Sequence, residues 1–228
     1  IIRACKETGL RSVAVYSEAD KNALHVRFAD EAVCIGPPSA SASYLYIPNV
    51  ISAADVTGAD AVHPGYGFLA ENVTFAEAVG AHGMTFIGPG PEQLTTFGDK
   101  LSAKAAARAA GVPLLPGSIG AVPDLEAAVI AAVDIGYPLL VKAAFGGGGK
   151  GMRIARDERE LRRVFALTEA EAEAAFGNGA LFLERFLPAP RHVEVQFASD
   201  RFGNAIHIGE RDCSLQRRHQ KLVEEAPM

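Results

Sequence analysis

The sequence is short of cysteine and has no long apolar run, and both shortages exclude classes of protein. Its three cysteines, Cys5, Cys34 and Cys213, are odd in number, far apart and in no CxxC pair. This pattern excludes a disulfide framework and a cysteine zinc site, and it fits a reducing compartment, so we expect a cytoplasmic protein. No apolar segment reaches the roughly 20 residues that a membrane-spanning helix needs, so we expect no membrane segment.

An excess of positive charge is also missing. The 228 residues carry a net charge of −5, and charged residues make up 21%, which argues against general nucleic-acid binding. Apolar residues make up 49%, enough for a core in one large domain or two small ones. The chain shows no signal peptide and no initiator methionine, and it begins as if inside a helix. We therefore expect it to be a piece of a longer protein.

Strands and helices alternate in the first part of the chain. Helical segments ending at glycine separate the short β-rich ones, and Asn49 or Ser52 is the expected cap of the helix that ends at Gly58. The expected strands are 11–17, 32–36, 60–63 and 84–89. This order predicts parallel βαβ units over residues 1–91.

The remainder of the chain has a different texture. One Ala- and Lys-rich helix is expected over 92–110, and two more begin at the capping residues Asp124 and Asp157. Strands are expected at 180–187, 192–198 and 205–210, the last two joined by a hairpin turn at 201–204. These elements predict an α+β region with mostly antiparallel pairing.

A glycine-rich stretch, Pro138–Ile154, organises this second region. Four consecutive glycines, 146–149, are bracketed by Lys142 and Lys150 and lie between two apolar runs. Glycine allows a backbone to close over a ligand, and ordering four of them is entropically costly. We interpret the stretch as a mobile flap whose N–H groups meet phosphate oxygens. A flexible hairpin tip or linker remains the alternative.

Two better-known phosphate motifs do not fit this stretch. Gly146, Gly148 and Gly151 satisfy G-x-G-x-x-G, but the dinucleotide fingerprint needs a helix to follow, and MRIAR is strand-like. A Walker A loop needs Ser or Thr where Met152 stands. A β-hairpin flap over a triphosphate is what remains.

Two lysines outside the glycines have competing interpretations. Lys142 lies in an apolar strand, where a charged group is costly unless it is paired or faces a ligand. It could also be an edge-strand lysine that reaches solvent. Lys100 follows Gly-Asp in a helix, and by its sequence alone it is an ordinary exposed helix lysine.

A densely charged stretch, ERDCSLQRRHQKLVEE, covers 210–225. Its mixed signs and lack of aromatic residues argue against nucleic acid and favour a network for a small anion or a nucleotide. A solvated, salt-bridged face remains the alternative. Cys213 is expected to be a small buried residue, and His192 and Glu194 share a strand face without the spacing of a metal site.

Taken together, the motifs resemble a known family. HPGYGFLAEN, FIGP, GDK, LVKAAFGGGGKGMR, RHVEVQ and ERDCSLQRRHQKLVEEAP occur in that order over essentially the whole chain. They resemble the biotin carboxylase component of biotin-dependent carboxylases, which belongs to the ATP-grasp family. Acetyl-CoA, propionyl-CoA, methylcrotonyl-CoA and pyruvate carboxylases share these motifs, so the final carboxyl acceptor stays open.

The resemblance implies a fold and a reaction. The fold is a Rossmann-like pre-ATP-grasp domain over 1–91, without its first strand, and a C-terminally truncated ATP-grasp domain over 92–228, with a mobile lid at about 114–186. ATP would phosphorylate bicarbonate to carboxyphosphate, and the CO₂ released from it would be captured by a biotin on a carrier domain. Such catalysis rests on positioning and on neutralising the transferred phosphoryl group.

The resemblance also implies roles for residues. Lys100 and Lys142 would contact ATP phosphates, and Gly147, Gly148 and Gly149 would close over them. Adenine would be bound by the segment Glu184, Arg185 and Leu187, in part through its backbone. The other expected nucleotide contacts are His192, Gln216 and His219; the expected catalytic residues are Lys221, near bicarbonate, and His219.

Further implications concern what accompanies this chain. The magnesium-binding glutamates, the glutamate that activates bicarbonate and the arginine that steadies biotin would follow Met228, so we expect no metal ligand here and no turnover by these residues alone. Expected partners are a biotin carboxyl carrier, a carboxyltransferase and a second copy of the chain, with Arg3 and Glu7 near that last interface. Two rival interpretations are another ATP-grasp ligase, such as a carbamoyl-phosphate synthase-like enzyme, and a non-catalytic nucleotide-binding module.

Overall fold

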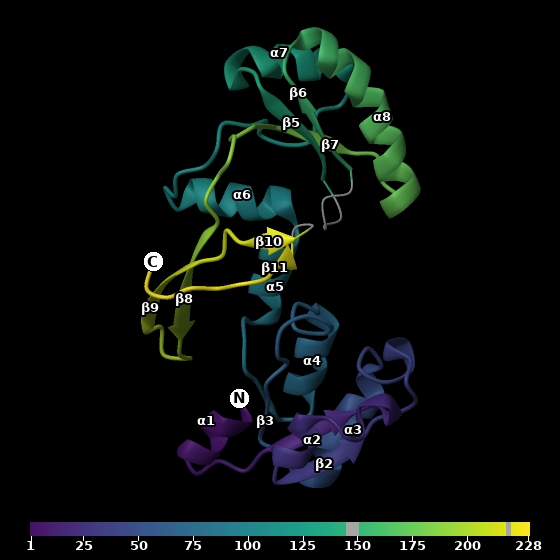
Figure 1. The fold of residues 1–228 in the computed structure, drawn as a ribbon, viewed down its shortest axis with the longest axis vertical. Coiled ribbons are helices and arrows are strands. Elements are labelled where there is room, and N and C mark those ends of the chain that lie inside the picture. The colour runs from purple at the N-terminus through teal and green to yellow at the C-terminus, as the bar shows by residue number, and fades with distance from the viewer. Residues whose placement is uncertain (145–150, 218–219) are drawn as a thin grey trace. The chain divides into compact units, whose positions relative to one another are not determined.

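The computed structural model describes residues 1–144, 151–217 and 220–228, and the chain divides into two compact units, Ile1–Gly98 and Asp99–Met228 (Figure 1). The predicted domain ranges of 1–91 and 92–228, and the lid at 114–186, stay predictions. None of the described helices is long and apolar enough to cross a membrane.

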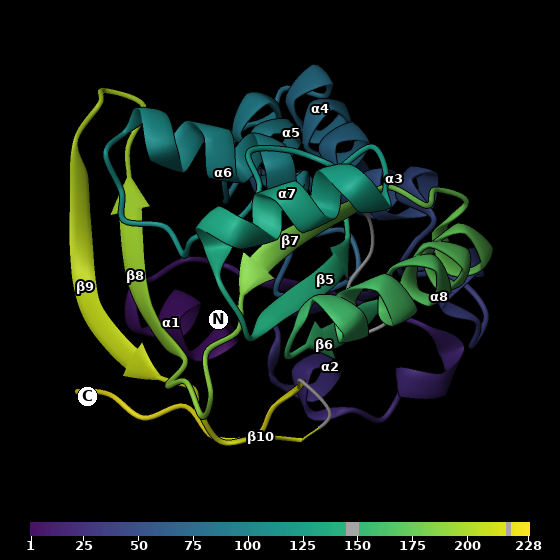
Figure 2. The same cartoon turned by 90° about the horizontal axis from the view of Figure 1, so that it is seen from above.

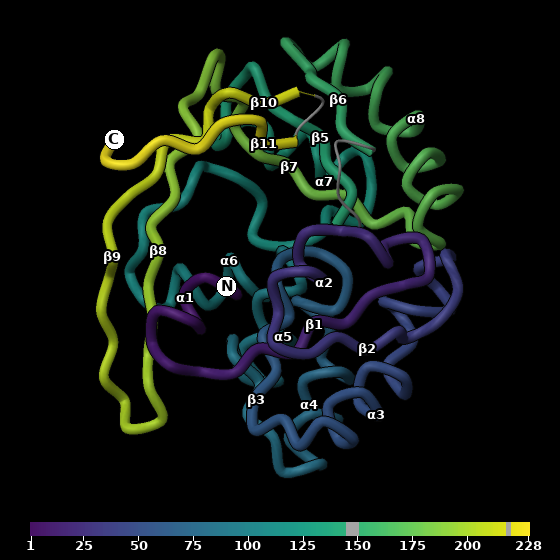
Figure 3. The backbone as a smooth tube through the Cα atoms, turned by 60° about the horizontal axis from the view of Figure 1, so that its bottom comes forward, coloured from purple at the N-terminus to yellow at the C-terminus, as the bar shows by residue number. Residues whose placement is uncertain are grey.

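The first unit alternates strands and helices, as predicted. Strands β1 and β2 pair in parallel and lie side by side in Figure 3. Strands β3 and β4 also pair in parallel, and they form a separate sheet. The α-helices and strands are α1 (Ile2–Glu7), β1 (Val13–Tyr16), α2 (Leu24–Phe28), β2 (Glu31–Cys34), α3 (Ile47–Thr57), β3 (Ala61–Val62), α4 (Val73–Ala81), β4 (Thr85–Phe86) and α5 (Pro91–Gly98).

The core of this unit lies between α3, α4 and the β3–β4 pair. Its buried members include Ile51, Phe75 and Val79, and Phe75 meets the ring of Phe86 edge-on at 5.9 Å. Helix α4 begins at Val73, because the side chain of the preceding Asn72 accepts the N–H of Phe75 at 2.8 Å and caps the helix.

The start of α3 differs from the prediction. The helix begins at Ile47, so Asn49 lies inside it and caps nothing; its side-chain amide instead donates to the carbonyl of Ile35 at 2.8 Å. Pro48 fits the first turn, where its missing N–H has no helical partner. The predicted end is correct, since Gly58 adopts a left-handed φ of 64°.

The second unit contains a three-stranded antiparallel sheet in the order β6-β5-β7, covered on one face by α7 and α8 (Figure 2). The unit also contains two separate two-stranded sheets, a hairpin of β8 and β9 and a short antiparallel pair of β10 and β11. The elements are α6 (Lys100–Ala109), α7 (Leu125–Ile135), β5 (Leu139–Ala143), β6 (Met152–Ala155), α8 (Glu158–Phe176), β7 (Leu181–Arg185), β8 (Val193–Ser199), β9 (Ala205–Asp212), β10 (Gln216–Arg217) and β11 (Gln220–Lys221).

Alternation along the strands separates the two faces of this sheet. Leu139, Val141 and Leu183 are fully buried in a core with α7 and α8. Because successive side chains point to opposite faces, Lys142 and Glu184 lie on the face away from that core. The sheet therefore carries these two polar side chains on the face opposite α7 and α8.

The single helix predicted over 92–110 is two helices. It breaks at Asp99, whose carboxylate accepts the N–H of Ser102 at 2.7 Å and caps α6. The break gives α6 its own beginning at Lys100. The predicted caps of α7 and α8 are confirmed, since Asp124 and Asp157 each accept the backbone N–H three residues on.

The predicted hairpin near the end of the chain is also confirmed. Strands β8 and β9 pair antiparallel, with an irregularity between Val195 and Phe197. At the turn, a carboxylate oxygen of Asp200 accepts the N–H groups of Phe202 and Asn204, at 2.8 and 3.0 Å.

Candidate functional site

A buried carboxylate joins two lysines on the face of the β6-β5-β7 sheet opposite α7 and α8. Glu184 is 8% exposed, and its two oxygens take different partners. The Nζ of Lys104 lies 2.6 Å from Oε1, and the Nζ of Lys142 lies 2.7 Å from Oε2. We call Lys100, Lys104, Lys142, Phe182 and Glu184 the lysine cluster.

Strand register and helix periodicity assemble this cluster. Lys142 of β5 is the register partner of Phe182 of β7, and Leu140 is that of Glu184. The Lys142 and Glu184 side chains are thus diagonal neighbours on one face. Lys100 and Lys104 are four residues apart on α6, so they share a helix face.

An aromatic ring lies beneath the ammonium groups. Phe182 is 1% exposed, and the Nζ atoms of Lys104 and Lys142 lie 4.5 and 5.6 Å from its ring centroid. The ring face attracts cations, which favours holding both ammonium groups here. Lys142 is therefore paired with a carboxylate, as the first interpretation of its sequence position allowed, and it is not an edge-strand lysine that reaches into solvent.

The electrostatics of the cluster are those of crowded cations around one anion. Burial opposes ionisation of Glu184, but hydrogen bonds from Lys104 and Lys142 outweigh it and lower the pKa of the carboxyl group. Burial lowers the pKa of Lys100, and the positive charge of Lys142 lowers it further, while Glu184 acts in the opposite direction. The ionised cluster has three positive charges and one negative charge, an excess that suits a polyanion.

A second polar cluster lies around Glu194 on the β8–β9 hairpin. One oxygen of Glu194 accepts Nε of Arg211 at 2.9 Å, and the other is bound by the ammonium group of Lys221. Nearby, Nε2 of Gln216 lies 2.5 Å from Nδ1 of His192. We call these five residues, His192, Glu194, Arg211, Gln216 and Lys221, the hairpin cluster.

Strand pairing and one tight loop build the hairpin cluster. Glu194 is paired in register with Arg211, and Gln216 with Lys221. The loop after β9 is held against the start of β8, because the N–H of Cys213 donates to the carbonyl of His192 at 2.7 Å. The start of β8, the end of β9 and the β10–β11 pair thereby lie close to one another.

Charge pairing shifts pKa values strongly in the hairpin cluster. Hydrogen bonds from Lys221 and then Arg211 lower the pKa of Glu194 to about 2. The same carboxylate raises the pKa of Lys221. Lys221 is therefore a firmly protonated cation, which suits binding a small anion better than accepting a proton.

Among the described residues, Glu194, Cys213 and Glu224 have ligand atoms within 4.8 Å of one another, a spacing that a metal ion can use. Arg211 lies near both carboxylates, at 2.9 Å from Glu194 and 3.7 Å from Glu224. The cations already neutralise these carboxylates, so the arrangement fits an ion-pair network better than a metal site. Cys213 is fully buried, as predicted.

The end of β7 is held on both edges. The N–H of Arg185 donates to the carbonyl of Pro116 at 2.8 Å, and that of Phe186 donates to Pro138 at 3.0 Å. In a strand the N–H and C=O of one residue share an edge, so the carbonyl of Arg185 points to the side of Pro116. The guanidinium of Arg185 turns back to the carbonyl of Tyr137 at 3.3 Å, so this residue has only its backbone to offer at that edge.

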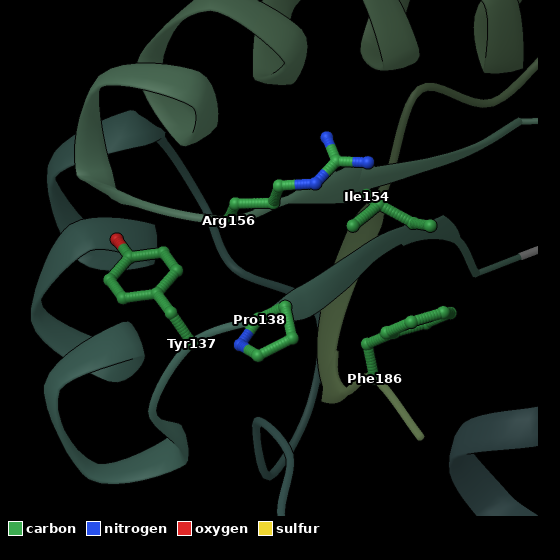
Figure 4. A pocket seen from close by; sticks show the side chains of 5 residues that line it. All are labelled: Tyr137, Pro138, Ile154, Arg156 and Phe186. Carbon is green, nitrogen blue, oxygen red and sulfur yellow. The ribbon is translucent and has the colours of Figure 1, made fainter. Parts of the chain in front are cut away.

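A shallow cavity of 390 Å³ opens near this end of the sheet (Figure 4). The side chains that surround it are Tyr137, Pro138, Ile154, Arg156 and Phe186. Its lining is mostly apolar, with Arg156 at one side. The lysine cluster does not line it, so the hollow and the excess charge are at different places on the sheet.

Comparison with known proteins identifies the family. A model of the biotin carboxylase N-terminal domain matches residues 1–94, and one of the carbamoyl-phosphate synthase L chain ATP-binding domain matches residues 99–228. A biotin carboxylase of Pseudomonas aeruginosa is 59% identical over all of this chain and 51% of its own length. The chain belongs to the biotin carboxylase family. It spans about half the length of the curated relatives it matches.

Solved structures agree with this family assignment. A biotin carboxylase of Campylobacter jejuni, described as a complex with β-γ-ATP, matches with a TM-score of 0.89 and 51% identity over 100% of this chain and 51% of that one. The biotin carboxylase domain of a Hydrogenobacter thermophilus 2-oxoglutarate carboxylase matches with a TM-score of 0.86 and 50% identity, over 99% and 50%. The predicted fold class, a biotin carboxylase N-terminal domain followed by an ATP-grasp domain, is confirmed.

The residues that the biotin carboxylase resemblance singled out lie in three groups. The lysine cluster contains Lys100, Lys142 and Glu184, and the hairpin cluster contains His192, Gln216 and Lys221. Arg185 and the half-exposed Leu187 lie at and after the end of β7. The remaining predicted residues, Gly147, Gly148, Gly149 and His219, lie outside the described residues.

Sequence reasoning missed residues that hold these clusters together. Lys104 lies in an Ala-rich helix that gives no sign of a partner, and its carboxylate is on a distant strand. Arg211 and Glu194 were visible as charged residues, but their pairing depends on hairpin register. The i,i+4 spacing of Lys100 and Lys104 is the one local signal that pointed to a shared face.

Proposed function

We propose that this chain is the nucleotide-binding part of a biotin carboxylase, an ATP-dependent ligase. The observation that carries the proposal is the lysine cluster, in which Lys104 and Lys142 bind one buried carboxylate and Lys100 lies within the electrostatic influence of both Lys142 and that carboxylate. An excess of fixed positive charge in a partly desolvated site suits the triphosphate of ATP. The family assignment supports the same conclusion.

The proposed reaction assigns work to particular side chains. ATP transfers its γ-phosphoryl group to bicarbonate and leaves as ADP, and carboxyphosphate then breaks into CO₂ and phosphate. The N1′ of carrier-bound biotin gives its proton to the phosphate and captures the CO₂. Lys100 and Lys142 bind phosphate oxygens, and Glu184 keeps Lys142 in place through its 2.7 Å contact. The protonated Lys221 binds bicarbonate or carboxyphosphate, and His219, which lies outside the described residues, is the second proposed catalytic residue. These residues position reactants and neutralise charge on the transferred group.

The remaining expected contacts complete the nucleotide site. Gly147, Gly148 and Gly149 close over the phosphates, and the backbone of Arg185 and Leu187 meets adenine. His192 and Gln216, already in contact with each other, lie along the ribose and phosphates. Magnesium accompanies ATP and neutralises its phosphates; no ligand for it is assigned in this chain.

The wider assembly is part of the proposal. We place the chain in an acyl-CoA carboxylase of the acetyl-CoA or propionyl-CoA type, which supplies fatty acid biosynthesis, in the cytoplasm. Its partners are a biotin carboxyl carrier, a carboxyltransferase and a second copy of itself. The Hydrogenobacter thermophilus relative is described as a domain dimer, which supports the last partner, but it belongs to a 2-oxoglutarate carboxylase, so the acceptor itself needs a direct test.

Another ATP-grasp ligase is the second candidate, because the model that matches residues 99–228 is named for carbamoyl-phosphate synthase. The match of residues 1–94 to a biotin carboxylase model favours the first candidate. The deciding experiment uses the protein made from the longest reading frame that contains this chain. We expect ADP release to require both bicarbonate and biotin. An equal rate without biotin contradicts the proposal.

The isolated 228 residues offer a second test. We propose that they do not complete turnover, because the resemblance assigns the groups that activate bicarbonate and steady biotin to other segments. Biotin- and bicarbonate-dependent ADP release by the purified 228-residue chain contradicts this part of the proposal.

A further inference from the structure

Lys104 has no part in the reaction as described, yet it is as tightly held as Lys142. Its Nζ lies 2.6 Å from Oε1 of Glu184, and its side chain is 22% exposed, against 23% for Lys142. It also lies 4.5 Å from the centroid of the Phe182 ring, closer than Lys142 does. A charged side chain held this closely in a mostly buried place is costly unless its contacts repay desolvation.

The division of Glu184 between two lysines has an electrostatic consequence. Each oxygen serves one ammonium group, so the single negative charge is shared. If Lys142 had this carboxylate to itself, the pair would be close to neutral, and a phosphate would gain little from it. With Lys104 on Oε1, the Lys142 pair retains positive charge while its Nζ stays in place.

A mechanical consequence follows from the same contacts. A carboxylate with one partner can turn both oxygens toward it, and a lysine has a long, rotatable stem. Lys104 comes from helix α6, and its bond to Oε1 keeps Oε2 directed at Lys142 on β5. The orientation of Lys142 is thereby set by a residue on another element.

We propose that Lys104 is a positioning residue of the nucleotide site: it holds Glu184 so that Lys142 is oriented toward the triphosphate and keeps its positive charge. This inference rests on the proposed function, since it assumes that Lys142 binds phosphate. Lys104 itself acts through Glu184 and need not touch the nucleotide.

A simpler role would be to pack over Phe182 and stabilise the fold. The variant Lys104→Met retains an unbranched apolar side chain over the ring but removes the charge and the hydrogen bond. Lys104→Arg keeps both charge and donors. A packing role is served better by methionine, whereas the positioning role is served by arginine, so the two variants separate them.

The experiment measures steady-state kinetics in the protein from the longest reading frame that contains this chain. We expect Lys104→Met to raise the KM for ATP by about tenfold. In metal sites, removing a residue that holds a ligating side chain in place lowers affinity by about 10- to 100-fold, and the expected change is at the lower end of that range. We expect kcat to change by less than about twofold, since binding of substrate and transition state weaken together. Lys104→Arg should restore KM to within about twofold.

The matched control is Arg108→Met, which removes the same charge from the exposed part of the same helix. Its KM for ATP should stay at the wild-type value. Circular dichroism and thermal unfolding establish that each variant is folded. If Lys104→Met does not fold, Lys104→Gln takes its place under the same criterion.

The outcomes separate this inference from the proposed function. Wild-type protein that does not hydrolyse ATP with bicarbonate and biotin refutes the proposed function, and this inference with it. A folded Lys104→Met or Lys104→Gln variant with wild-type KM overturns this inference alone, and so does an arginine variant as impaired as the methionine variant. If neither neutral variant folds, Lys104 is a stabilising residue and the inference is again wrong.

Discussion

Glu184 and Glu194 are each bound by two cationic side chains, but they differ in where they lie. Glu184 is on β7 above a packed core, and its side chain is 10% exposed. Glu194 is on the β8–β9 hairpin, with a side chain 23% exposed and its partner Lys221 36% exposed. Similar hydrogen bonds therefore operate in different surroundings.

Both pKa values are lowered, for different balances of causes. At Glu184 burial is the largest influence and opposes the lowering, and the two lysines overcome it. At Glu194 the hydrogen bonds from Lys221 and Arg211 dominate, and little opposes them. A strongly shifted pKa does not by itself mean a large contribution to stability, because solvent screens the attraction between exposed charges. Removing one partner of a buried pair costs more, because it leaves an uncompensated charge in the protein interior.

The largest expected difference between the two regions concerns one phenylalanine in each, Phe182 in the lysine cluster and Phe197 on strand β8. Phe182 is 1% exposed, and Phe197 on the hairpin is 68% exposed. We expect Phe182→Ala to lower the free energy of unfolding by about 3–5 kcal/mol, because it empties a packed site. Phe197→Ala should change it by no more than about 0.5 kcal/mol. Urea unfolding followed by circular dichroism measures both, and equal losses would remove the distinction.

The carboxylates themselves test the comparison next. Glu184→Gln leaves Lys104 and Lys142 close together without a counter-charge, and we expect a loss of about 2 kcal/mol. Glu194→Gln should cost less than about 1 kcal/mol, since its partners are more exposed. The same urea experiment applies. A larger loss for Glu194→Gln would mean that hairpin pairing outweighs burial.

Acid should remove the stability that each of the two carboxylates contributes, because the pKa of both is lowered in the folded protein. A carboxyl whose pKa is lower in the folded state stabilises the fold above its unfolded pKa, and that stability is lost as the pH falls. For Glu194 the loss should occur between the ordinary value of 4.5 and about 2. We expect carbon NMR to show Glu194 ionised at pH 3. Protonation of Glu194 near pH 4.5 would contradict the pairing with Lys221 and Arg211.

The smallest expected effect is a difference in thiol reactivity. Cys213, beside the hairpin cluster, is 0% exposed, and burial and then Glu194 raise the pKa of its thiol. Cys34 is exposed. We expect a thiol reagent at pH 8 to modify Cys34 quickly and Cys213 only after denaturation. Mass spectrometry of the labelled peptides measures this, and equal labelling rates would show that the hairpin region opens readily.

Much of the local structure was predictable from the sequence because its signals are local. The predicted caps Asp124 and Asp157 each accept an N–H three residues away, so the sequence near each helix start contains both partners. The parallel pairs followed from the alternation of elements. The start of α3 was predicted less well. The helix begins at Ile47, and the side chain of Asn49, an expected cap, donates to the carbonyl of Ile35 instead.

Within the candidate site, residue types were predictable and partners were not. The apolar strand around Lys142 indicated that this lysine needs a partner or a ligand. Its partner, Glu184, lies 42 positions away and is defined by the pairing of β5 with β7. The helix break at Asp99, which starts α6 at Lys100, did have a local signal, because glycine is common at helix ends and aspartate at helix starts; the single helix predicted over 92–110 overlooked Gly98 and Asp99.

The sequence by itself determined the family, the alternation of elements and the caps of α7 and α8, because the motifs, the element pattern and the caps are each read from residues close together in the chain. Only the tertiary structure decided that Lys104 and Lys142 share Glu184, and that Lys221 and Arg211 share Glu194. Charge pairing acts over a few ångströms of space, and register and helix packing decide which charges come within that range.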